Sequence, residues 1–549
     1  MKNFIVFFIL VIYLNLGAQP MKTAYINGVI FTCDENNSKA EAILVKENKI
    51  EFVGKNNEVL ELLDNQTEVI DLKGKLVLPG FIDNHVHFLT GGLYLLGIDL
   101  RPANSTYEFK KILKEYSEKN KGKWITGGYW DHEKWENKTY PTKEMIDEVV
   151  PDQPVFVSRL DGHMGVANSL ALKLAGITKD TQSPEGGLIL KDPLTGEPTG
   201  LLKDNAMDLV FKIIPPPTDD EYYESLKAAL NEAKKYGVTS VQDISFPAAL
   251  KAFNRAKQEG ILTCRIFIRW PISDYKYLVE NGIKAGYGDD LIRMGSLKAF
   301  VDGSLGSSTA WFFEKYNQDT TTYGLPMDIV IDGSLEKWAL DADKNGLQLS
   351  IHAIGDRANS YILDVFEKIV KNNPSWDRRF RVEHAQHVRF EDIKRFKQLD
   401  VIASVQPYHC IDDGVWAEKR IGSERIKYTY PFKSFLEEGV KICFGTDWYV
   451  APLNPLLGIY AAVTRRTLDD KNPDGWIPEQ KISVEDAIKC YTINSAYASF
   501  EEKIKGSIEV GKLADFIVLS ENILEIDPIR IKDVEVELTV FDGKIIYKK

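Results

Sequence analysis

Cysteine is scarce in this chain, and the few cysteines are scattered. The 549 residues include five, namely Cys33, Cys264, Cys410, Cys443 and Cys490, and no two of them form a Cys-x-x-Cys pair. An odd number without paired spacing argues against a disulfide framework and against a cysteine zinc site. Any metal chemistry in this chain must therefore use other side chains.

Signatures of several common protein classes are also missing. The sequence has no GxxxxGK[ST] or GxGxxG loop for phosphates and no GxSxG nucleophile elbow. Positive charge is not in excess, since the formal net charge is −12. A phosphate backbone requires a basic face, so the sequence predicts no nucleic-acid partner and favours a small-molecule substrate.

The first twenty residues differ from the rest because they hold a long apolar run. Met1 and Lys2 precede FIVFFILVIYLNL, and small residues follow, an order typical of a secretory signal peptide over residues 1–20. The run is too short for a comfortable membrane span. We therefore expect cleavage after Ala18, export to the periplasm or secretion, and no stable membrane span afterwards. The alternative is that Met21 is the true start and the protein is cytoplasmic.

The middle of the chain alternates apolar β-rich runs with amphipathic helical stretches, which is typical of βα units around a parallel sheet. The candidate strands are GFIDNHVH, VTSVQD, LTCRIFIRW, GSLKAFVD, LQLSIHA, RFRVEHA, VIASVQP and VKICFGTD. Eight such strands predict an α/β fold, a TIM (β/α)8 barrel over residues 78–496. The interval from His87 to Asp243 is too long for one unit, so we expect an inserted subdomain at about 90–235 that covers the site.

Short alternating strands stand at both ends of the chain. EAILVKENKIEFVG near the start and VEVELTVFDGKIIYKK at the end share this pattern, with Asn-Gly and Gly turns nearby. We therefore predict a small β-sandwich domain built from residues 21–77 and 497–549. The oligomeric state is left open, and a homo-oligomer is compatible with the sequence.

Histidines stand at the carboxyl ends of the predicted strands. The chain has eight histidines, and four of them, His85, His87, His352 and His384, occupy such ends, while Asp447 ends the last strand. Barrel enzymes place catalysis at these ends, and residues i and i+2 of a strand share one face. Imidazole and carboxylate suit zinc and similar divalent ions, so the pattern predicts a metal centre.

Lys298 is unusual because it lies inside the apolar strand GSLKAFVDG. A buried ammonium is costly unless it is paired. One interpretation is a salt bridge to Asp302 or Asp447. The other is carbamylation by carbon dioxide, which turns the cation into a carboxylate able to bridge two metals.

With these features the chain resembles the amidohydrolase superfamily, and within it the YtcJ-like branch (amidohydrolase family 3) that includes N-substituted formamide deformylases. The resemblance covers about residues 22 to 549 and rests on motifs in order, among them LVLPGFIDNHVH, SRLDGHMGVANSLAL, LKAFVDGSLGSSTA, IHAIGDRAN, VEHAQ and FGTDWYVAPLNPL. It implies a TIM barrel with a β-sandwich, a metal centre, and hydrolysis of amide-type, non-peptide carbon–nitrogen bonds.

The resemblance implies six metal ligands: His85, His87, Lys298, His352, His384 and Asp447. The first two histidines with the aspartate would hold one ion, the two later histidines would hold a second, and a carbamate on the lysine would bridge them. Zinc is the expected metal. Whether one ion or two is bound stays open, because members of the superfamily differ.

The mechanism expected from this centre is metal-assisted hydrolysis. A bound divalent metal lowers the pKa of water to about 7, and the resulting hydroxide would attack the substrate carbonyl. Asp447 would accept the water proton and pass it to the leaving nitrogen. An ester, lactone or phosphoryl substrate at the same centre is the alternative activity, and a non-catalytic binding protein on this fold is the other alternative.

Further residues are candidates for substrate contacts or for support of the ligands. Arg159 and His163 lie in the insertion, where Trp130 would line an apolar pocket wall, although a structural role is the alternative for His163 and Trp130. His409 follows the seventh strand and would reach the pocket. Asp302 and Gln406 would contact and orient the metal ligands without binding the metal themselves.

Overall fold

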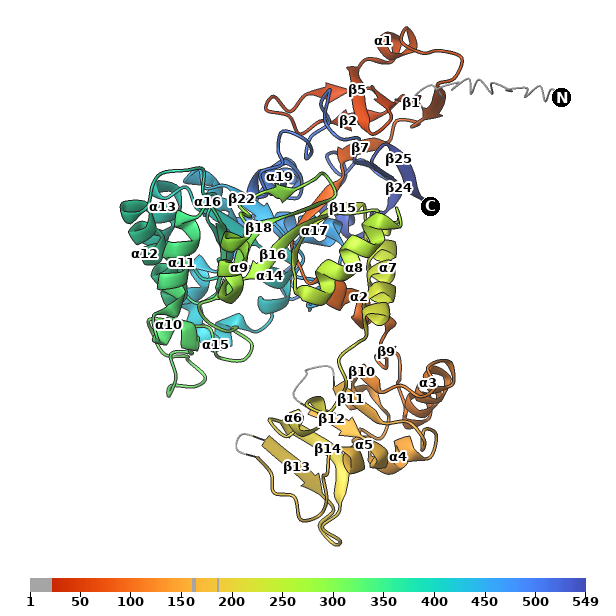
Figure 1. The fold of residues 1–549 in the computed structure, drawn as a ribbon, viewed down its shortest axis with the longest axis vertical. Coiled ribbons are helices and arrows are strands. Elements are labelled where there is room, and N and C mark those ends of the chain that lie inside the picture. Colours follow the sequence, from red (N-terminus) through yellow and green to blue (C-terminus); the bar gives the residue numbers. More distant parts are fainter. Residues whose placement is uncertain (1–21, 160–163, 185–186) are drawn as a thin grey trace, which may run out of the picture.

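The computed structural model describes residues 22–159, 164–184 and 187–549. The barrel lies at the centre of the molecule (Figure 1). Its eight parallel strands have the order β22-β21-β20-β19-β18-β16-β15-β8. All eight apolar runs predicted as strands are found in this sheet, which confirms the TIM-like barrel. The strands are β8 (Phe81–Val86), β15 (Val238–Ile244), β16 (Arg265–Pro271), β18 (Ile292–Phe300), β19 (Gln348–Ala353), β20 (Arg381–His384), β21 (Ile402–Val405) and β22 (Ile442–Phe444).

The first and last strands meet through hydrogen bonds just beyond the end of β22. The backbone N–H of Asp447 donates to the carbonyl of His85 at 2.7 Å, and that of Thr446 donates to the Asp83 carboxylate at 2.9 Å. Gly445 permits this approach, because a Cβ there would lie 2.4 Å from the backbone nitrogen of His85. The sheet is thereby nearly closed, and the polar ends of its two edge strands are brought together.

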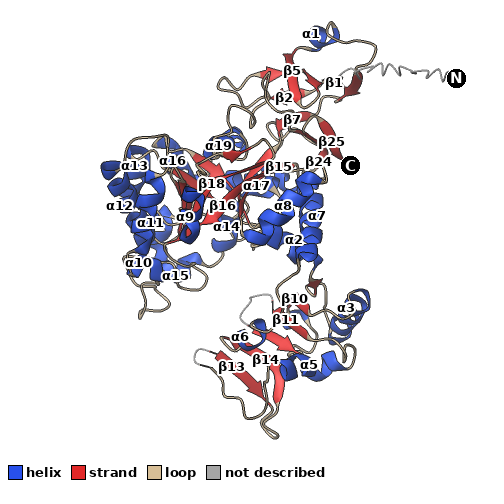
Figure 2. Cartoon of the chain, in the orientation of Figure 1, coloured by secondary structure: helices blue, strands red, loops and turns tan. Residues whose placement is uncertain are grey.

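Helices follow the strands and cover the outside of the barrel, because a parallel sheet is buried on both faces (Figure 2). At the start of α7, Thr218 and Glu221 form a capping box, and the buried Leu226, Ala229 and Leu230 follow at helical spacing. The helices are α2 (Phe88–Leu96), α7 (Asp219–Lys235), α8 (Pro247–Gln258), α9 (Tyr275–Glu280), α10 (Asp328–Ile331), α11 (Ser334–Lys344), α12 (Asp356–Asn372), α13 (Phe390–Gln398), α14 (Pro407–Asp413), α15 (Ala417–Arg425), α16 (Phe432–Glu437), α17 (Pro455–Thr464), α18 (Val484–Cys490) and α19 (Ile493–Ala498).

The N-terminal segment forms one further sheet, in the order β5-β4-β1-β6, and both ends of the chain contribute to another, in the order β25-β24-β23-β7-β2-β3. In their shared apolar core Tyr25 packs edge-on against Phe516, with ring centroids 4.9 Å apart. Gly80 separates β7 of this domain from β8 of the barrel. The strands are β1 (Lys22–Ile26), β2 (Val29–Phe31), β3 (Lys39–Ala40), β4 (Ala42–Lys46), β5 (Lys49–Gly54), β6 (Glu68–Asp71), β7 (Leu76–Pro79), β23 (Phe516–Leu519), β24 (Val536–Phe541) and β25 (Lys544–Lys548).

Between α2 and α7 the chain forms an inserted subdomain with its own sheet, in the order β13-β14-β12-β11-β10-β9. It has a separate core that includes Phe109 and Trp135. In Figure 1 it lies on the side of the barrel away from the terminal sheets. Its elements are β9 (Ile98–Asp99), α3 (Thr106–Lys119), β10 (Ile125–Trp130), α4 (Lys143–Asp147), β11 (Val155–Arg159), β12 (Met164–Ala167), α5 (Ser169–Leu174), β13 (Gly187–Lys191), β14 (Pro198–Asp204) and α6 (Asp208–Phe211).

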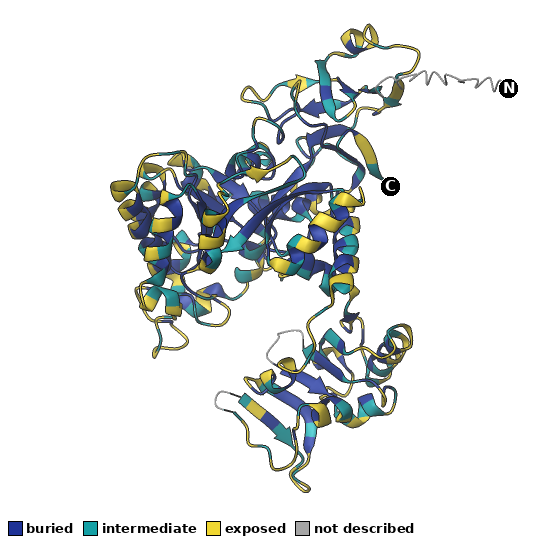
Figure 3. Cartoon of the chain, in the orientation of Figure 1, coloured by how far each residue is buried: buried dark blue, intermediate teal, exposed yellow. Residues whose placement is uncertain are grey.

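Burial is concentrated in the barrel strands and the inner faces of their helices (Figure 3). Leu297, Ile351 and Val382 are fully buried, as expected for strands covered on both faces. The same strands also bury charged side chains, which a packed core does not need. Among the described helices, none combines the length and the apolar character needed to cross a membrane.

Candidate metal centre

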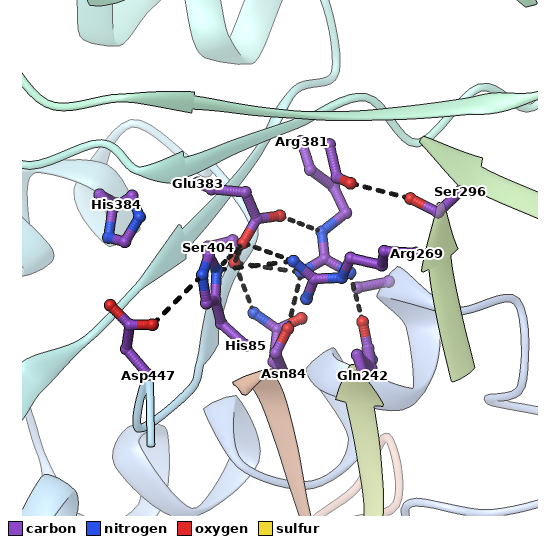
Figure 4. Close-up of polar contacts among 12 residues, drawn as sticks. Asn84, His85, Gln242, Arg269, Ser296, Arg381, Glu383, His384, Ser404 and Asp447 are labelled. Atoms are coloured by element: carbon purple, nitrogen blue, oxygen red, sulfur yellow. Dashed lines mark hydrogen bonds and ion pairs between the residues drawn. The ribbon is translucent and has the colours of Figure 1, made fainter. Parts of the chain in front are cut away.

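Three side chains from different barrel strands converge at one point. His85 lies on β8, His384 ends β20 and Asp447 follows β22. One ligand atom from each lies within 4.8 Å of the others, and all three residues are buried (Figure 4). Two imidazoles and a carboxylate around a common point are a suitable donor set for a divalent metal ion.

Asp447 supplies the carboxylate of this group. Its Oδ1 lies 3.6 Å from Nε2 of His85 and 3.3 Å from Nε2 of His87, which directly follows β8. Burial alone would raise the pKa of Asp447, but the nearby histidines outweigh that effect and hold the pKa well below its usual range. Asp447 is therefore ionised at neutral pH, as a metal ligand or a general base has to be.

His384 and Asp447 share an unusual backbone conformation. The φ angle is 71° at His384 and 58° at Asp447, in the left-handed region that residues other than glycine rarely adopt. Strain of this kind persists only where the surrounding structure enforces it, and it clusters at functional sites. Two of the three clustered side chains thus stand on strained backbone.

His352, on β19, lies beside this cluster. Its ring centroid is 4.5 Å from that of His384. Its Nε2 faces the carbonyl oxygen of Gly303 at 3.0 Å, whereas its buried Nδ1 has no hydrogen-bond partner in the described part of the chain. An imidazole with one nitrogen held by a carbonyl and the other unpaired is oriented for metal binding.

Lys298, on β18, is buried, and no described residue forms a hydrogen bond with its Nζ. The salt bridge to Asp302 or Asp447 that the sequence suggested is therefore not formed. Nζ instead lies over the ring of Phe300, 4.7 Å from its centroid. Burial lowers the pKa of Lys298 to about 7, and the negative charges of Glu383 and Asp447 offset only part of that effect.

Gln406 and Asp302, which were expected to support the ligands, each lie next to a histidine of the site. The Oε1 of Gln406 is 2.7 Å from Nδ1 of His384, which leaves the Nε2 of that ring for a metal. The carboxylate of Asp302 accepts hydrogen bonds from the backbone N–H groups of Trp311, Ile354 and Gly355, at 2.7, 3.0 and 2.8 Å. It also lies 3.4 Å from Nε2 of His352, so it anchors this loop next to a proposed ligand.

The other predicted contact residues are divided between the centre and the insertion. His409, on α14, helps to lower the pKa of Asp447, and its buried Nε2 lacks a hydrogen-bond partner among the described residues. Trp130 is fully buried in the core of the insertion, so it packs there and does not line a pocket wall. Arg159 lies on β11 of the insertion, 4.0 Å from Asp131. His163 lies outside the described residues.

Sequence reasoning missed a set of buried polar residues beneath the cluster (Figure 4). Glu383 forms ion pairs with Arg269 and Arg381, each at 2.9 Å, and all three side chains are fully buried. The available signal was the presence of charged residues within the apolar runs RIFIRW and RFRVEHA. Charges inside a buried strand indicate paired groups with a specific role.

A row of tyrosines, also missed, leads from the centre to the insertion. The ring of Tyr449 lies 6.1 Å from that of His87 and 6.0 Å from that of Tyr94, and Tyr94 lies 4.8 Å from Tyr129 of β10. Tyr449 is 39% exposed, in contrast to the buried ligands. The centre is therefore bordered on the His87 side by aromatic residues that solvent reaches.

The barrel and its site define the class of protein, a metal-dependent hydrolase with its centre at the carboxyl ends of parallel strands. The chain belongs to the amidohydrolase family, whose family model matches residues 68–547. This match confirms the resemblance to amidohydrolase family 3 that the sequence motifs indicated.

Similar proteins match over nearly the whole chain. Protein LONG AFTER FAR-RED 3 of Arabidopsis thaliana is 40% identical, covering 90% of this chain and 86% of its own length. The putative amidohydrolase YtcJ of Bacillus subtilis is 33% identical over 96% of this chain and 100% of its own. N-substituted formamide deformylase of Arthrobacter pascens is 27% identical over 95% and 98%. A solved structure of an uncharacterized metal-dependent hydrolase from Pyrococcus furiosus superposes with a TM-score of 0.76 at 31% identity, covering 92% of this chain and 100% of that one.

Proposed function

We propose that this protein hydrolyses an amide-type, non-peptide carbon–nitrogen bond with Asp447 as general base and then general acid. One observation carries the proposal: the ionised, buried carboxylate of Asp447 directs Oδ1 toward His85 and His87 and has no hydrogen-bond partner there among the described residues. A relative that matches nearly end to end is named for a formamide substrate, which supports this bond class.

The donor set is suited to one or two divalent ions, with zinc as the expected metal. Three buried polar atoms at the site, Oδ1 of Asp447, Nδ1 of His352 and Nζ of Lys298, lack hydrogen-bond partners within the described ranges. Buried polar atoms are ordinarily paired, so these atoms point to a missing partner. The clustered His85, His384 and Asp447 would hold one ion, with His87 next to Asp447 and His352 next to His384.

Asp447 moves the proton in the proposed reaction. When bound, the metal supplies an activated water and polarises the substrate carbonyl. The Asp447 carboxylate accepts a proton from the attacking water as the water oxygen bonds to the carbonyl carbon. It then gives this proton to the leaving nitrogen as the carbon–nitrogen bond breaks, and the products are a carboxylic acid and an amine.

We also propose that Lys298 carries a carbamate. The lone pair of the neutral Nζ attacks the carbon of carbon dioxide, and a proton leaves the nitrogen, so that an anion with two oxygens replaces a cation. The support is geometric: Nζ is buried without a hydrogen-bond partner in the described chain, and β18 pairs with the strand that bears His352. An ammonium at this position would repel bound divalent cations.

A substrate screen tests the bond class. Protein stripped with a chelator and reloaded with zinc should hydrolyse members of a panel of N-formyl amines, N-acyl amino acids and cyclic amides, and stripped protein should not. Esters, lactones and phosphotriesters belong in the same panel. Turnover of these alone would contradict the proposed bond class, and a preparation that neither holds nor responds to metal would contradict the metal centre.

The variant Asp447→Asn tests the role of the aspartate. Asparagine keeps an oxygen ligand but cannot accept a proton at neutral pH, so turnover should fall by about 10²-fold or more while much of the metal stays bound. Metal content and turnover are measured on the same sample, with His409→Gln as the comparison. Near-full turnover of metal-loaded Asp447→Asn would assign the base to another group, and loss of activity in His409→Gln would identify it.

We further propose that residues 1–20, which lie outside the described part of the chain, direct export and that cleavage after Ala18 removes most of them. The mature protein should begin near Gln19, after the NLGA junction. N-terminal sequencing of the native protein settles this point. A start at Met21 together with recovery in the cytoplasmic fraction would contradict export.

A further inference from the structure

Glu383 lies on the side of His85 opposite to the metal centre. It precedes His384 on β20, and its Oε2 accepts a hydrogen bond from Nδ1–H of His85 (Figure 4). Both side chains are buried, with 1% exposure for His85 and none for Glu383. The other ring nitrogen, Nε2, points at Asp447 across 3.6 Å. The proton on Nδ1 thus leaves the Nε2 lone pair directed into the centre.

Glu383 is itself held by two arginines from different strands. Arg269 of β16 pairs with Oε2 at 2.9 Å, and Arg381 of β20 pairs with Oε1 at 2.9 Å. Ser404 of β21 also donates its hydroxyl to Oε2 at 2.6 Å. Each carboxylate oxygen of Glu383 thus faces an arginine, and Oε2 also faces Ser404 and His85. These contacts place Glu383 to orient His85 from the side of the ring that is turned away from Asp447.

Arg381 is fixed in turn without any metal, whereas Nε and Nη2 of Arg269 are buried and have no hydrogen-bond partner among the described residues. Arg381 donates through Nη2 to the carbonyl of Asn84 at 3.0 Å and to Ser404 Oγ at 3.1 Å, and through Nη1 to Gln242. Asn84 stands next to His85 on β8, so the same arginine holds both the backbone and the side-chain partner of the ligand. Groups with this many buried contacts have little freedom to rotate.

We propose that Glu383 is a positioning residue that fixes the ring orientation and the Nδ1–H tautomer of His85, so that its Nε2 is directed at a metal before the metal binds. The proposal rests on the metal centre proposed above. Groups that orient a ligand in this way typically contribute 10–100-fold in metal affinity or activity. The two arginines serve to keep the carboxylate charged and in place.

Two substitutions separate the contact from the charge. Glu383→Asp keeps the negative charge for Arg269 and Arg381 but is one methylene too short to reach His85. Glu383→Gln keeps the length and an acceptor oxygen but loses the charge. Glu501→Asp is the matched control, because Glu501 is also a buried glutamate in an ion pair, with Lys505 at 2.8 Å, and it is no part of the metal centre.

Metal affinity and spectrum are measured together with stability. Glu383→Asp should raise the zinc Kd by about 10–100-fold in chelator competition and alter the visible spectrum of the cobalt(II)-loaded protein. The melting temperature of its metal-free form should fall no more than that of Glu501→Asp, and Glu383→Gln should show a smaller loss of affinity. Wild-type zinc affinity and cobalt spectrum in Glu383→Asp would overturn the proposal. The proposal would also be overturned if Glu501→Asp lost as much zinc affinity as Glu383→Asp at the same drop in melting temperature, because the effect would then not be specific to Glu383.

A measurement on the unmodified protein decides the matter if neither Glu383 variant folds. With the rings of the eight histidines labelled with ¹⁵N, His85 should show a protonated Nδ1 both before and after zinc addition, and zinc should shift its Nε2 resonance. Metal binding through Nδ1 would overturn the proposal. If wild-type protein binds no zinc at all, the proposed metal centre is wrong. Wild-type zinc affinity in Glu383→Asp is a different result, because it would refute only the role of Glu383.

Discussion

Under the proposed carbamylation, the number of bound metals would depend on the single residue Lys298. Its amine is buried, it lies over Phe300 and it has no hydrogen-bond partner in the described chain. As an ammonium it would oppose cation binding, and as a carbamate it would offer two oxygens to a pair of ions. One covalent modification would thus reverse the sign of the charge beside His352 and His384.

Lys298→Ala should therefore lose one metal equivalent and most of the activity. Formate or acetate added at high concentration should restore part of both, because a short carboxylate can take the place of the carbamate. Lys298→Arg should not recover either property, since a guanidinium stays charged and does not carbamylate.

The carbamate has a readout that does not depend on activity. Wild-type protein equilibrated with ¹³C-labelled bicarbonate should show a carbamate carbon signal that is absent from Lys298→Ala. Fully metal-loaded wild-type protein without this signal would contradict the proposal and indicate a centre held by histidine and aspartate alone.

At the scale of elements, α14 is tied to neighbouring loops by one carboxylate. Oδ2 of Asp413 accepts hydrogen bonds from the Gln386 amide and the Tyr430 hydroxyl, both at 2.6 Å. Burial raises the pKa of Asp413 from 3.8 to about 6, an effect that Tyr430, His409 and Gln386 oppose and Asp412 reinforces. This carboxyl therefore binds its proton more tightly in the folded than in the unfolded chain.

Stability should consequently depend on pH through Asp413. Between about pH 4 and 6 the folded chain holds a proton on Asp413 that the unfolded chain has released. The stabilisation of the folded chain by this proton is therefore complete below pH 4 and is lost as the pH rises through 6. The loss amounts to about 2–3 kcal/mol. The side chain in Asp413→Asn cannot ionise, so this variant should lack the pH-dependent part of the stability that comes from Asp413. Thermal unfolding at pH 4.5 to 7 tests it: wild type should lose stability relative to Asp413→Asn as the pH rises, and parallel curves would contradict the assignment.

The contact between the loop after β22 and strand β8 depends on a glycine. In Gly445→Ala the new Cβ would meet the backbone nitrogen of His85 at 2.4 Å. We expect a loss of about 1–3 kcal/mol and weaker zinc binding, because the strand that carries His85 must shift. Gly306→Ala is the control, since the nearest atom to its Cβ is a Trp416 ring carbon at 3.8 Å. Equal melting temperatures and zinc affinities for the two variants would contradict this, because β8 would then move without a loss of stability or of metal binding.

At the scale of the whole molecule, one arginine joins the barrel to the terminal sheets. Arg265 of β16 is buried and pairs with Asp515 at 2.6 Å, and with Asp542 between β24 and β25 at 2.9 Å. Breaking a buried pair by removing one partner costs about 3–5 kcal/mol, because the other charge stays buried. The terminal sheets are thereby part of the stability of the barrel.

Arg265→Leu should accordingly lower the apparent melting temperature strongly. Lys368→Ala, which removes an exposed ion pair with Glu336 at 2.7 Å, should cost about 1 kcal/mol or less. Differential scanning calorimetry of both variants also shows whether the terminal domain unfolds separately. Similar small shifts for the two variants would contradict a structural role for the buried pair.

Much of the fold and most of the proposed ligands could be predicted from local sequence features. An apolar run followed by His352, His384 or Asp447 carries its information within a few residues, because strand burial and the carboxyl end of a strand are local properties. The outer limits of the inserted subdomain and of the terminal domain stay predictions.

Long-range placement was decided only by the tertiary structure. His85 and Glu383 are 298 residues apart in sequence, and they meet because strand register and barrel closure bring β8 next to β20 across the interior. The same closure groups His384 with His85 and Asp447, while the ring of His352 lies 4.5 Å from that of His384. Trp130, which was expected to line a pocket wall or to pack in a core, is buried inside the insertion. The sequence by itself determined which side chains are available at the strand ends. The distances among them depend on how eight separate strands pack, and no local pattern encodes that packing.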